Sequence, residues 1–195
     1  MDKMFFRTTN NVFFVVDTET TGLHTEDADA IEISALKVRV AEDGYAIEDT
    51  FDTYINPGYP LPPAIVEFNA RNNTGVTDEL LSLSPSKKDA TDRFMEFIGD
   101  NRNIVGHNIP FDMGFLNKLL QETGYALMEP DLFDTLAESR GKVKGSHKLC
   151  SMFEHTSKRY TNSAVGLKGF HNSLADCYAT LDVLDYLVHL EEESE

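Results

Sequence analysis

Two carboxylates follow an unbroken apolar run near the start of the chain. Residues 12–16 lead directly into Asp17 and Glu19, with Thr18 between them. Such a run of β-branched and aromatic residues predicts a strand buried on both faces. Because side chains alternate along a strand, Asp17 and Glu19 point to one side and Thr18 to the other. Ionised carboxylates beside a core strand are costly unless paired or metal-bound, so the sequence offers a candidate cation site or, alternatively, a strand that frays into a polar loop.

A third carboxylate, Asp112, lies in the first turn of a predicted helix over 110–123. Pro110 in the first turn and Gly124 just past the end support this helix. An acid in that turn complements the helix dipole, which explains Asp112 without a ligand. At 100° per residue, however, Asp112 shares a face with Leu116, and dipole complementation does not require an inward side chain. The inward position favours a bound cation.

A fourth carboxylate, Asp176, opens the predicted final helix over 174–190. The spacing of Ser173 and Asp176 is that of a capping box, which is a complete non-catalytic explanation. Yet Asp176 lies on the apolar face of this helix, whereas Asp182 and Asp185 lie on the opposite side, where we expect solvated charges. Asp176 is therefore a further candidate ligand.

His171 stands on the loop that leads into the final helix, two residues before Ser173. A lone histidine is more often a surface or packing residue. Here the imidazole can approach the same cavity as the carboxylates, and its ordinary pKa lies near about 6.5, which suits it to accept a proton from water.

Four carboxylates that converge from different elements cannot all ionise without cations. Oxygen ligands suit Mg²⁺ or Mn²⁺, and the chain lacks the thiolate or multi-histidine set that zinc favours. Two such ions about 3.5–4 Å apart can hold the attacking and leaving oxygens of a phosphoryl transfer. These residue types predict metal-assisted hydrolysis of a phosphate ester, and they do not identify the ester.

The elements that must position these residues follow an ordered pattern. Segments 30–40 and 47–55 alternate apolar and polar residues and predict half-buried strands, separated at Gly44, in a three-stranded antiparallel meander. Strands followed by helices with one interleaved strand predict an α/β fold whose sheet carries helices on its faces. Further helices are expected at 64–70, 77–81, 86–98, 132–139 and 148–155, a strand at 103–106, and loops at 141–146 and 161–169.

Length and composition fit one domain over residues 1–195, with a solvated acidic tail at 191–195. No apolar run reaches the roughly 18 residues of a membrane span, and residues 1–10 lack the apolar stretch of a signal peptide. The two cysteines, Cys150 and Cys177, are too few for a disulfide scaffold and lack metal-ligand spacing. We expect a cytoplasmic protein without a membrane partner.

Charge is unevenly distributed along the chain. The net charge of −16 argues at first against a nucleic-acid partner. Residues 140–172, however, carry seven lysines and arginines against the single acid Glu154. A basic segment in an acidic protein is compatible with a phosphate-bearing substrate. The run RGKVKGSHK at 140–148 is interpreted either as a phosphate contact or as a solvated loop.

Three short motifs occur in order along the chain: DTETTGL at 17–23, GHNIPFDMGFL at 106–116 and HNSLADCYAT at 171–180. They resemble the exonuclease motifs of the DEDDh (DnaQ-like) family, which includes the proofreading epsilon subunits of bacterial DNA polymerase III. The spacing of His171 and Asp176 matches the histidine variant of the third motif. A D-x-E alone is a weak signal, whereas three ordered motifs that span most of the chain are specific. NTGVTDELL at 73–81 and DTLAESR at 134–140 resemble the segments between them.

The resemblance implies an RNase H-like fold with three antiparallel strands followed by parallel strands, and helices on both faces. It implies a 3′→5′ exonuclease that releases nucleoside 5′-monophosphates from single-stranded or frayed DNA with two Mg²⁺ or Mn²⁺ ions. His171 would be the general base, and the metal ligands would be Asp17, Glu19, Asp112 and Asp176. Residues expected around the 3′-terminal nucleotide are Thr18, Thr20, Gly22, Leu23, His107, Asn108 and Phe111. Asp134 is interpreted first as a helix cap.

Two alternatives stay open. The first is an RNA 3′-end trimming exoribonuclease of the same family, because discrimination between DNA and RNA depends on contacts to the 2′-OH. The second is a polymerase-associated module whose main role is docking, with a DNA polymerase subunit as its partner. The expected partners are thus single-stranded nucleic-acid 3′ ends, with DNA favoured over RNA, and a DNA polymerase subunit if the docking alternative holds.

Overall fold

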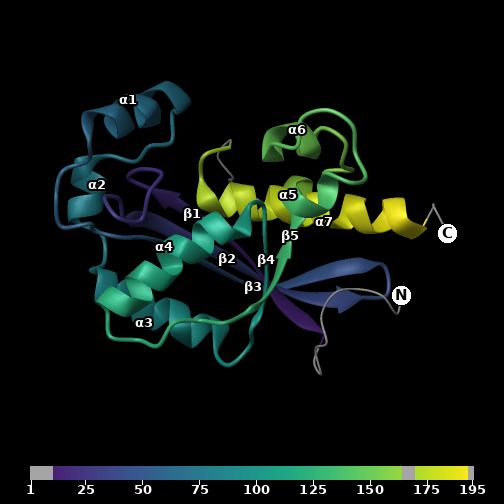
Figure 1. The fold of residues 1–195 in the computed structure, drawn as a ribbon, viewed down its shortest axis with the longest axis horizontal. Helices are drawn as coiled ribbons and strands as arrows, with labels where there is room; N and C mark the ends of the chain where they lie inside the picture. The colour runs from purple at the N-terminus through teal and green to yellow at the C-terminus, as the bar shows by residue number, and fades with distance from the viewer. Residues whose placement is uncertain (1–10, 164–169, 193–195) are drawn as a thin grey trace.

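A five-stranded mixed sheet organises the protein. The computed structural model describes residues 11–163 and 170–192, and within them the strand order is β3-β2-β1-β4-β5 (Figure 1). β1 pairs antiparallel with β2, and β2 with β3, while β4 joins β1 and β5 joins β4 in parallel. The predicted mixed sheet is confirmed. The strands are β1 (Val12–Thr20), β2 (Ala30–Ala41), β3 (Gly44–Tyr54), β4 (Asn103–Gly106) and β5 (Asp131–Asp134).

Helices cover both faces of this sheet. α3 and α4 pack on one face, and α7 packs on the other with α5 and α6 beside it (Figure 1). The predicted loop at 161–169 begins with a short 3-10 turn at Thr161–Ser163, and residues 164–169 lie outside the described part. The α-helices are α1 (Pro63–Asn72), α2 (Asp78–Ser82), α3 (Lys87–Ile98), α4 (Ile109–Glu122), α5 (Thr135–Ser139), α6 (Leu149–Phe153) and α7 (Ser173–Glu192).

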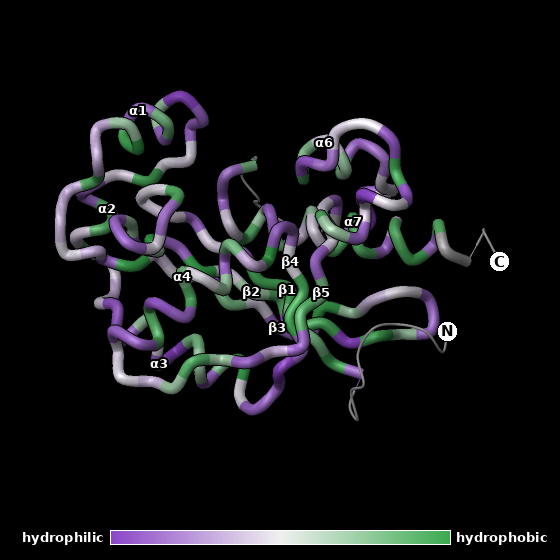
Figure 2. The backbone as a smooth tube through the Cα atoms, in the orientation of Figure 1, coloured by the Kyte–Doolittle hydropathy of each residue, from purple (hydrophilic) through white to green (hydrophobic). Residues whose placement is uncertain are grey.

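β1 is buried on both faces because its side chains pack into two separate hydrophobic clusters, one on each face of the sheet. Phe14 and Val16 pack with residues of α3 and α4, whereas Phe13 and Val15 pack against α7. The hydrophobic colour in Figure 2 gathers on the central strands, and hydrophilic colour dominates the surrounding loops. The alternation therefore fixes which side of β1 every following residue faces, including Asp17 and Glu19.

The helix expected over 132–139 is wrong for its first half. Residues Asp131–Asp134 form β5, which pairs in parallel with β4, and a helix begins only at Thr135. Four residues are too few to show a strand period, and their pairing with β4 is a tertiary interaction that local sequence does not encode.

β2 is more deeply buried than its alternation suggested. Glu32 and Ser34 are buried because α7 covers their side of the strand. Ser34 Oγ lies 2.6 Å from Ser173 Oγ, and Asn172 Nδ2 donates to Glu32 Oε1 at 2.8 Å. Gly44, expected as a break, is the first residue of β3 and pairs with Ala41.

Two expectations about α7 are corrected. Asn172 caps the helix, since its side-chain oxygen accepts from Ala175 N at 3.3 Å, while the Ser173 hydroxyl faces Ser34. Asp182 and Asp185, expected in solvent, are buried. Asp182 accepts hydrogen bonds of 2.9 Å from the backbone N–H groups of residues 160 and 161. That segment folds over the polar side of the helix, which local periodicity does not reveal.

Within residues 11–163 and 170–192, no helix combines the length and apolarity that crossing a bilayer requires. Both cysteines are free thiols, with Cys150 exposed and Cys177 buried. The predicted acidic tail begins inside α7, which extends to residue 192, and residues 193–195 lie outside the described part.

Replacing Asp182 with alanine should destabilise the fold. The change leaves two backbone donors, one buried and one part-buried, without their carboxylate, at a cost of about 3 kcal/mol. Chemical denaturation should show this loss for Asp182→Ala, with Asp100→Ala, at an exposed position, unchanged within about 0.5 kcal/mol. Equal stability of the two variants would contradict a structural role for Asp182.

Candidate active site

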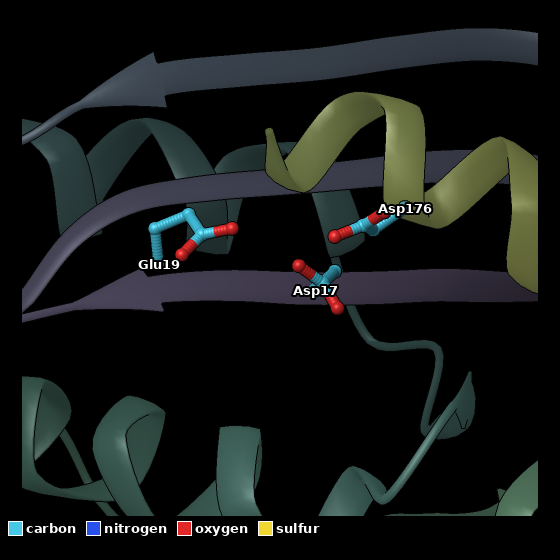
Figure 3. A group of neighbouring side chains, drawn as sticks. All are labelled: Asp17, Glu19 and Asp176. Atoms are coloured by element: carbon cyan, nitrogen blue, oxygen red, sulfur yellow. The ribbon is translucent and has the colours of Figure 1, made fainter. Parts of the chain in front are cut away.

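Three carboxylates meet where the end of β1 faces the start of α7. Oxygen atoms of Asp17, Glu19 and Asp176 all lie within 4.8 Å of one another (Figure 3). Figure 3 shows Asp17 and Asp176 directed toward each other, with Glu19 beside them along the strand. Asp17 and Glu19 are half-buried and Asp176 is buried. The predicted convergence of these three groups is thus present in the fold.

Asp112 lies close by but is held from the other face of β1. It sits in the first turn of α4, where its side chain is buried. Its Oδ1 accepts hydrogen bonds from Thr18 N at 2.9 Å and from Thr18 Oγ1 at 2.8 Å. Asp112 is not part of the three-residue group, yet its charge raises the pKa of Asp17. Thr18 therefore fixes the fourth predicted ligand against the strand.

Burial and the neighbouring negative charges raise the pKa values of these carboxyl groups. Burial, then the charges of Asp112 and Asp176, raise the pKa of Asp17 well above its ordinary value. Burial, followed by the charge of Asp176, raises the pKa of Glu19 to about 8. Burial also raises the pKa of Asp176 to about 7 and, against the Thr18 hydrogen bonds, that of Asp112 to about 7. An oxygen-only group that resists ionisation in this way fits a hard divalent cation, which would supply the missing positive charge.

Glu32 is a further carboxylate beside the site that sequence analysis missed. It pairs directly with Glu19 across β1 and β2, and its charge raises the pKa of Glu19. It also accepts a hydrogen bond from Asn172, the residue after His171. One signal could have found it. Residues 32 and 36 point to the same side of β2, and Leu36 packs under α7, so Glu32 faces the side of the sheet that α7 covers.

His171 stands at the rim of the site. Its φ of 69° lies in the left-handed region, and its backbone N–H donates to Asp176 Oδ2 at 3.2 Å. The imidazole is exposed and lies edge-on to Phe68 of α1, with ring centroids 5.0 Å apart. The fold thus ties the backbone of the predicted base to one predicted metal ligand and leaves its ring accessible.

The loop after β1 carries several residues predicted to contact substrate. Thr20 Oγ1 donates to Gly22 O at 2.6 Å, and a Cβ at Gly22 would meet Ala28 Cβ at 3.0 Å. These contacts keep the loop compact. Leu23, at its tip, is 76% exposed. An exposed leucine on a braced loop beside an acidic site is available for contact with a bound ligand.

Asp29 anchors the far end of this loop. It accepts hydrogen bonds from Lys87 Nζ and from the Tyr59 hydroxyl, both at 2.8 Å, and Lys118 Nζ lies 3.0 Å away. Burial opposes ionisation of Asp29, but the hydrogen bonds from the two lysines lower its pKa below the ordinary value. The ion pairs fasten the loop to α3 and α4, so Leu23 is presented from a fixed base.

The remaining predicted contact residues surround the start of α4. His107 bonds through Nδ1 to Thr135 Oγ1 at 2.9 Å and through Nε2 to the His147 carbonyl at 2.8 Å. Asn108 is exposed in the left-handed region, and the half-buried Phe111 ring lies 5.1 Å from that of Phe115. Both ring nitrogens of His107 are thus engaged within the protein.

Asp134 has the capping role that the sequence suggested. Its Oδ1 accepts from Leu136 N at 3.0 Å, which caps α5, and from Asn108 N at 2.8 Å. One carboxylate therefore joins the start of α5 to the residue that precedes α4. This link, together with His107, fixes the segment after β5 against the site.

Comparison with known proteins identifies the class. Residues 14–184 match the exonuclease family RNase_T, and the chain belongs to this family. The fold is RNase H-like, and the resemblance to DnaQ-like 3′→5′ exonucleases is confirmed. The family is described as one of exonucleases, and membership of it implies a divalent metal cofactor.

One curated relative is the PolC-type DNA polymerase III of Lacticaseibacillus paracasei, which is 35% identical over 185 residues. The match covers 93% of this chain but only 11% of that polymerase. Exonuclease X in complex with 5′ overhanging duplex DNA shares the fold with a TM-score of 0.65 and 18% identity, covering 92% of this chain and 93% of that one. Exonuclease I of E. coli with a dT13 oligonucleotide gives a TM-score of 0.72 at 16% identity, covering 94% and 42%.

Removal of divalent ions should make stability fall as pH rises. A carboxyl whose pKa is raised by folding binds its proton more tightly in the folded state, so stability is lost between the ordinary values of 3.8 to 4.5 and the folded values of about 7 to 8. In EDTA, the melting temperature should be lower at pH 8 than at pH 5.5, and Mg²⁺ should restore it at pH 8.

The double variant Asp17→Asn/Asp176→Asn is the comparison, because it removes two of the repelling charges. It should show a flatter pH profile in EDTA and a smaller response to Mg²⁺. Identical profiles for the two proteins would show that these carboxyls do not titrate as their surroundings imply.

Proposed function

We propose that this protein is a 3′→5′ exonuclease that releases nucleoside 5′-monophosphates from single-stranded or frayed DNA ends. The observation that carries the proposal is the meeting of Asp17, Glu19 and Asp176 within 4.8 Å, with Asp112 fixed beside them. Membership of the exonuclease family supports it. So do the DNA ligands of two structural neighbours, a dT13 oligonucleotide and a 5′ overhanging duplex.

The proposed cofactor is a pair of divalent ions, Mg²⁺ or Mn²⁺, held by the four aspartate and glutamate side chains. When bound, such ions stabilise the charge that develops on the attacking and leaving oxygens of the phosphodiester. The protein contributes the positions of its carboxylates. β1 fixes Asp17 and Glu19 on one side, while Thr18 holds Asp112 on the other.

His171 is proposed to accept the proton of the attacking water. A neutral imidazole can do so near neutral pH, and its exposed ring at the rim of the acidic group can reach solvent. The backbone bond from His171 to Asp176 ties the base to a residue of the acidic group.

The 3′-terminal nucleotide is proposed to lie between Leu23 and the start of α4. Leu23 is exposed on its braced loop, and Phe111 offers a half-buried ring on the other side. Apolar and stacking contacts of this kind tolerate any base, which suits removal of nucleotides without sequence preference. The other residues proposed to surround this nucleotide are Thr20, Gly22, His107 and Asn108.

Proofreading for a DNA polymerase is a second candidate role. A segment of the PolC-type DNA polymerase III of L. paracasei is 35% identical to this chain. Co-purification with a replicative polymerase, and stimulation of hydrolysis at mismatched primer ends, would support it. A fully active monomer that neither binds nor responds to a polymerase would contradict it.

Direction and metal dependence can be measured together. With Mn²⁺, a 3′-labelled DNA oligonucleotide should lose its label as a mononucleotide in the first turnover, while a 5′-labelled one should shorten stepwise. Asp17→Ala should lower the rate by at least about 10³-fold because it removes a ligand that the chemistry requires. Asp100→Ala, an exposed control, should retain the wild-type rate.

Matched DNA and RNA oligomers distinguish the substrate. A higher kcat/KM on RNA would reassign the protein as an exoribonuclease with the same chemistry. Rapid hydrolysis in excess EDTA, or release of the 5′ label first, would refute the proposed mechanism or its direction.

Loss of the histidine should affect turnover more than binding. His171→Ala is expected to lower kcat by about 10²- to 10⁴-fold, the usual contribution of a general base, with a small change in KM. His155→Ala, which removes an imidazole stacked on Tyr186, provides the control and should leave kcat unchanged. A similar kcat for both variants would remove His171 from the mechanism.

A further inference from the structure

A basic loop follows α5, the helix that Asp134 links to the residue before α4. Residues 140–148 connect α5 to α6 and contain Arg140, Lys142, Lys144 and Lys148, with no acid among them. The whole chain carries a net charge of −16. A cluster of cations in so acidic a molecule creates a local field opposite to that of the surrounding surface.

Three of these cations have no acidic partner among the residues that the structure describes. Lys142 forms an ion pair with Glu138. Within the described residues, Arg140, Lys144 and Lys148 are exposed and make no ion pair, although acids outnumber bases along the chain. By contrast, Lys87, Lys88 and Lys118 elsewhere in the described residues each bind a carboxylate. The loop therefore keeps positive charge available for another molecule.

Two hydrogen bonds of His147 hold the loop against α5 and the segment that leads into α4. The His147 carbonyl lies 2.8 Å from His107 Nε2, and His147 Nδ1 lies 3.1 Å from Ser139 Oγ. His107 leads directly into α4, which supplies Asp112 in its first turn. The basic loop is thus attached to the segment that leads into the helix carrying a proposed metal ligand.

The outer side of the loop is open. A Cβ added at Gly141 or Gly145 would meet no atom within 4 Å, and Gly145 has a φ of +107°. Residues 144–146 are exposed. An extended ligand can therefore approach Lys144 without displacing other parts of the described chain.

We infer that Arg140, Lys144 and Lys148 form a track for the phosphodiesters that lie upstream of the 3′-terminal nucleotide. The inference rests on the proposed function. Metal ions at the acidic group can compensate the charge only of phosphates close to the scissile bond. Each further nucleotide of the strand adds one negative phosphodiester charge. The basic loop offsets these charges, and it prevents the acidic surface from repelling the rest of the substrate.

The test compares the triple variant Arg140→Gln/Lys144→Gln/Lys148→Gln with a control that removes the same charge elsewhere. The control is Lys37→Gln/Arg39→Gln/Lys88→Gln. Lys37 and Arg39 lie opposite residues 14 and 12 near the start of β1, away from Asp17, and Lys88 lies on α3. All three make surface ion pairs. Such pairs contribute little to stability, so both triple variants should fold.

Binding of fluorescein-labelled dT20 is measured by anisotropy in Ca²⁺ at several salt concentrations. For single strands, log K falls with log salt by about 0.7 per phosphate contact, so three lost contacts should reduce the slope by about 2. The same loss should weaken binding at low salt by at least about 10-fold. The charge-matched control should keep the wild-type slope.

Hydrolysis is measured on dT20 and on the p-nitrophenyl ester of thymidine 5′-monophosphate, which has no upstream phosphate. The basic-loop variant should raise KM for dT20 by about 10-fold or more without a comparable change for the small ester. A wild-type salt slope in this variant, an equal slope change in the control, or no binding of dT20 by the wild-type protein would each overturn the track. Binding without hydrolysis of either substrate would refute the proposed function and leave the track supported.

Discussion

The repulsion among carboxylates at the end of β1 is the constraint on which the site depends. Asp17, Glu19 and Asp176 approach one another within 4.8 Å, and Asp112 and Glu32 add their charges from nearby. Such a group opposes folding whenever it ionises. The apolar clusters on the two faces of the sheet must therefore hold it in place, and a divalent cation would convert the repulsion into binding energy.

Side chains alternate along β1, so the strand positions site residues on both faces of the sheet. Phe13 and Val15 pack under α7 and carry Asp17 and Glu19 with them, so the carboxylates face Asp176. Thr18 points to the other side and binds Asp112 through its backbone and its hydroxyl. A shift of one residue in the pairing of β1 with β2 would turn each β1 side chain to the opposite face of the sheet, so Asp17 and Glu19 would no longer face Asp176.

Further hydrogen bonds hold the segments around the site in fixed positions relative to β1. Asn172 caps α7 and also donates to Glu32, while the backbone of His171 donates to Asp176. His107 and Asp134 join α4 to the segment that follows β5. The basic loop of residues 140–148 is attached to this framework through His107.

Local sequence was enough to predict several features of this protein. An unbroken apolar run indicated the central strand, and the order of strands and helices indicated the mixed sheet. A period of two gave the shared direction of Asp17 and Glu19, and a period of 3.6 gave the inward direction of Asp176. The helical face of Asp112 likewise predicted its buried side chain. Three other features became evident only in the folded protein: residues 131–134 form a strand, Asp182 is buried, and Glu32 lies beside the site. These features depend on partners distant in sequence: β4 pairs with β5, residues 160–161 bind Asp182, and α7 covers Glu32. Local pattern reports the direction of a side chain, but only the assembled fold determines what meets it there.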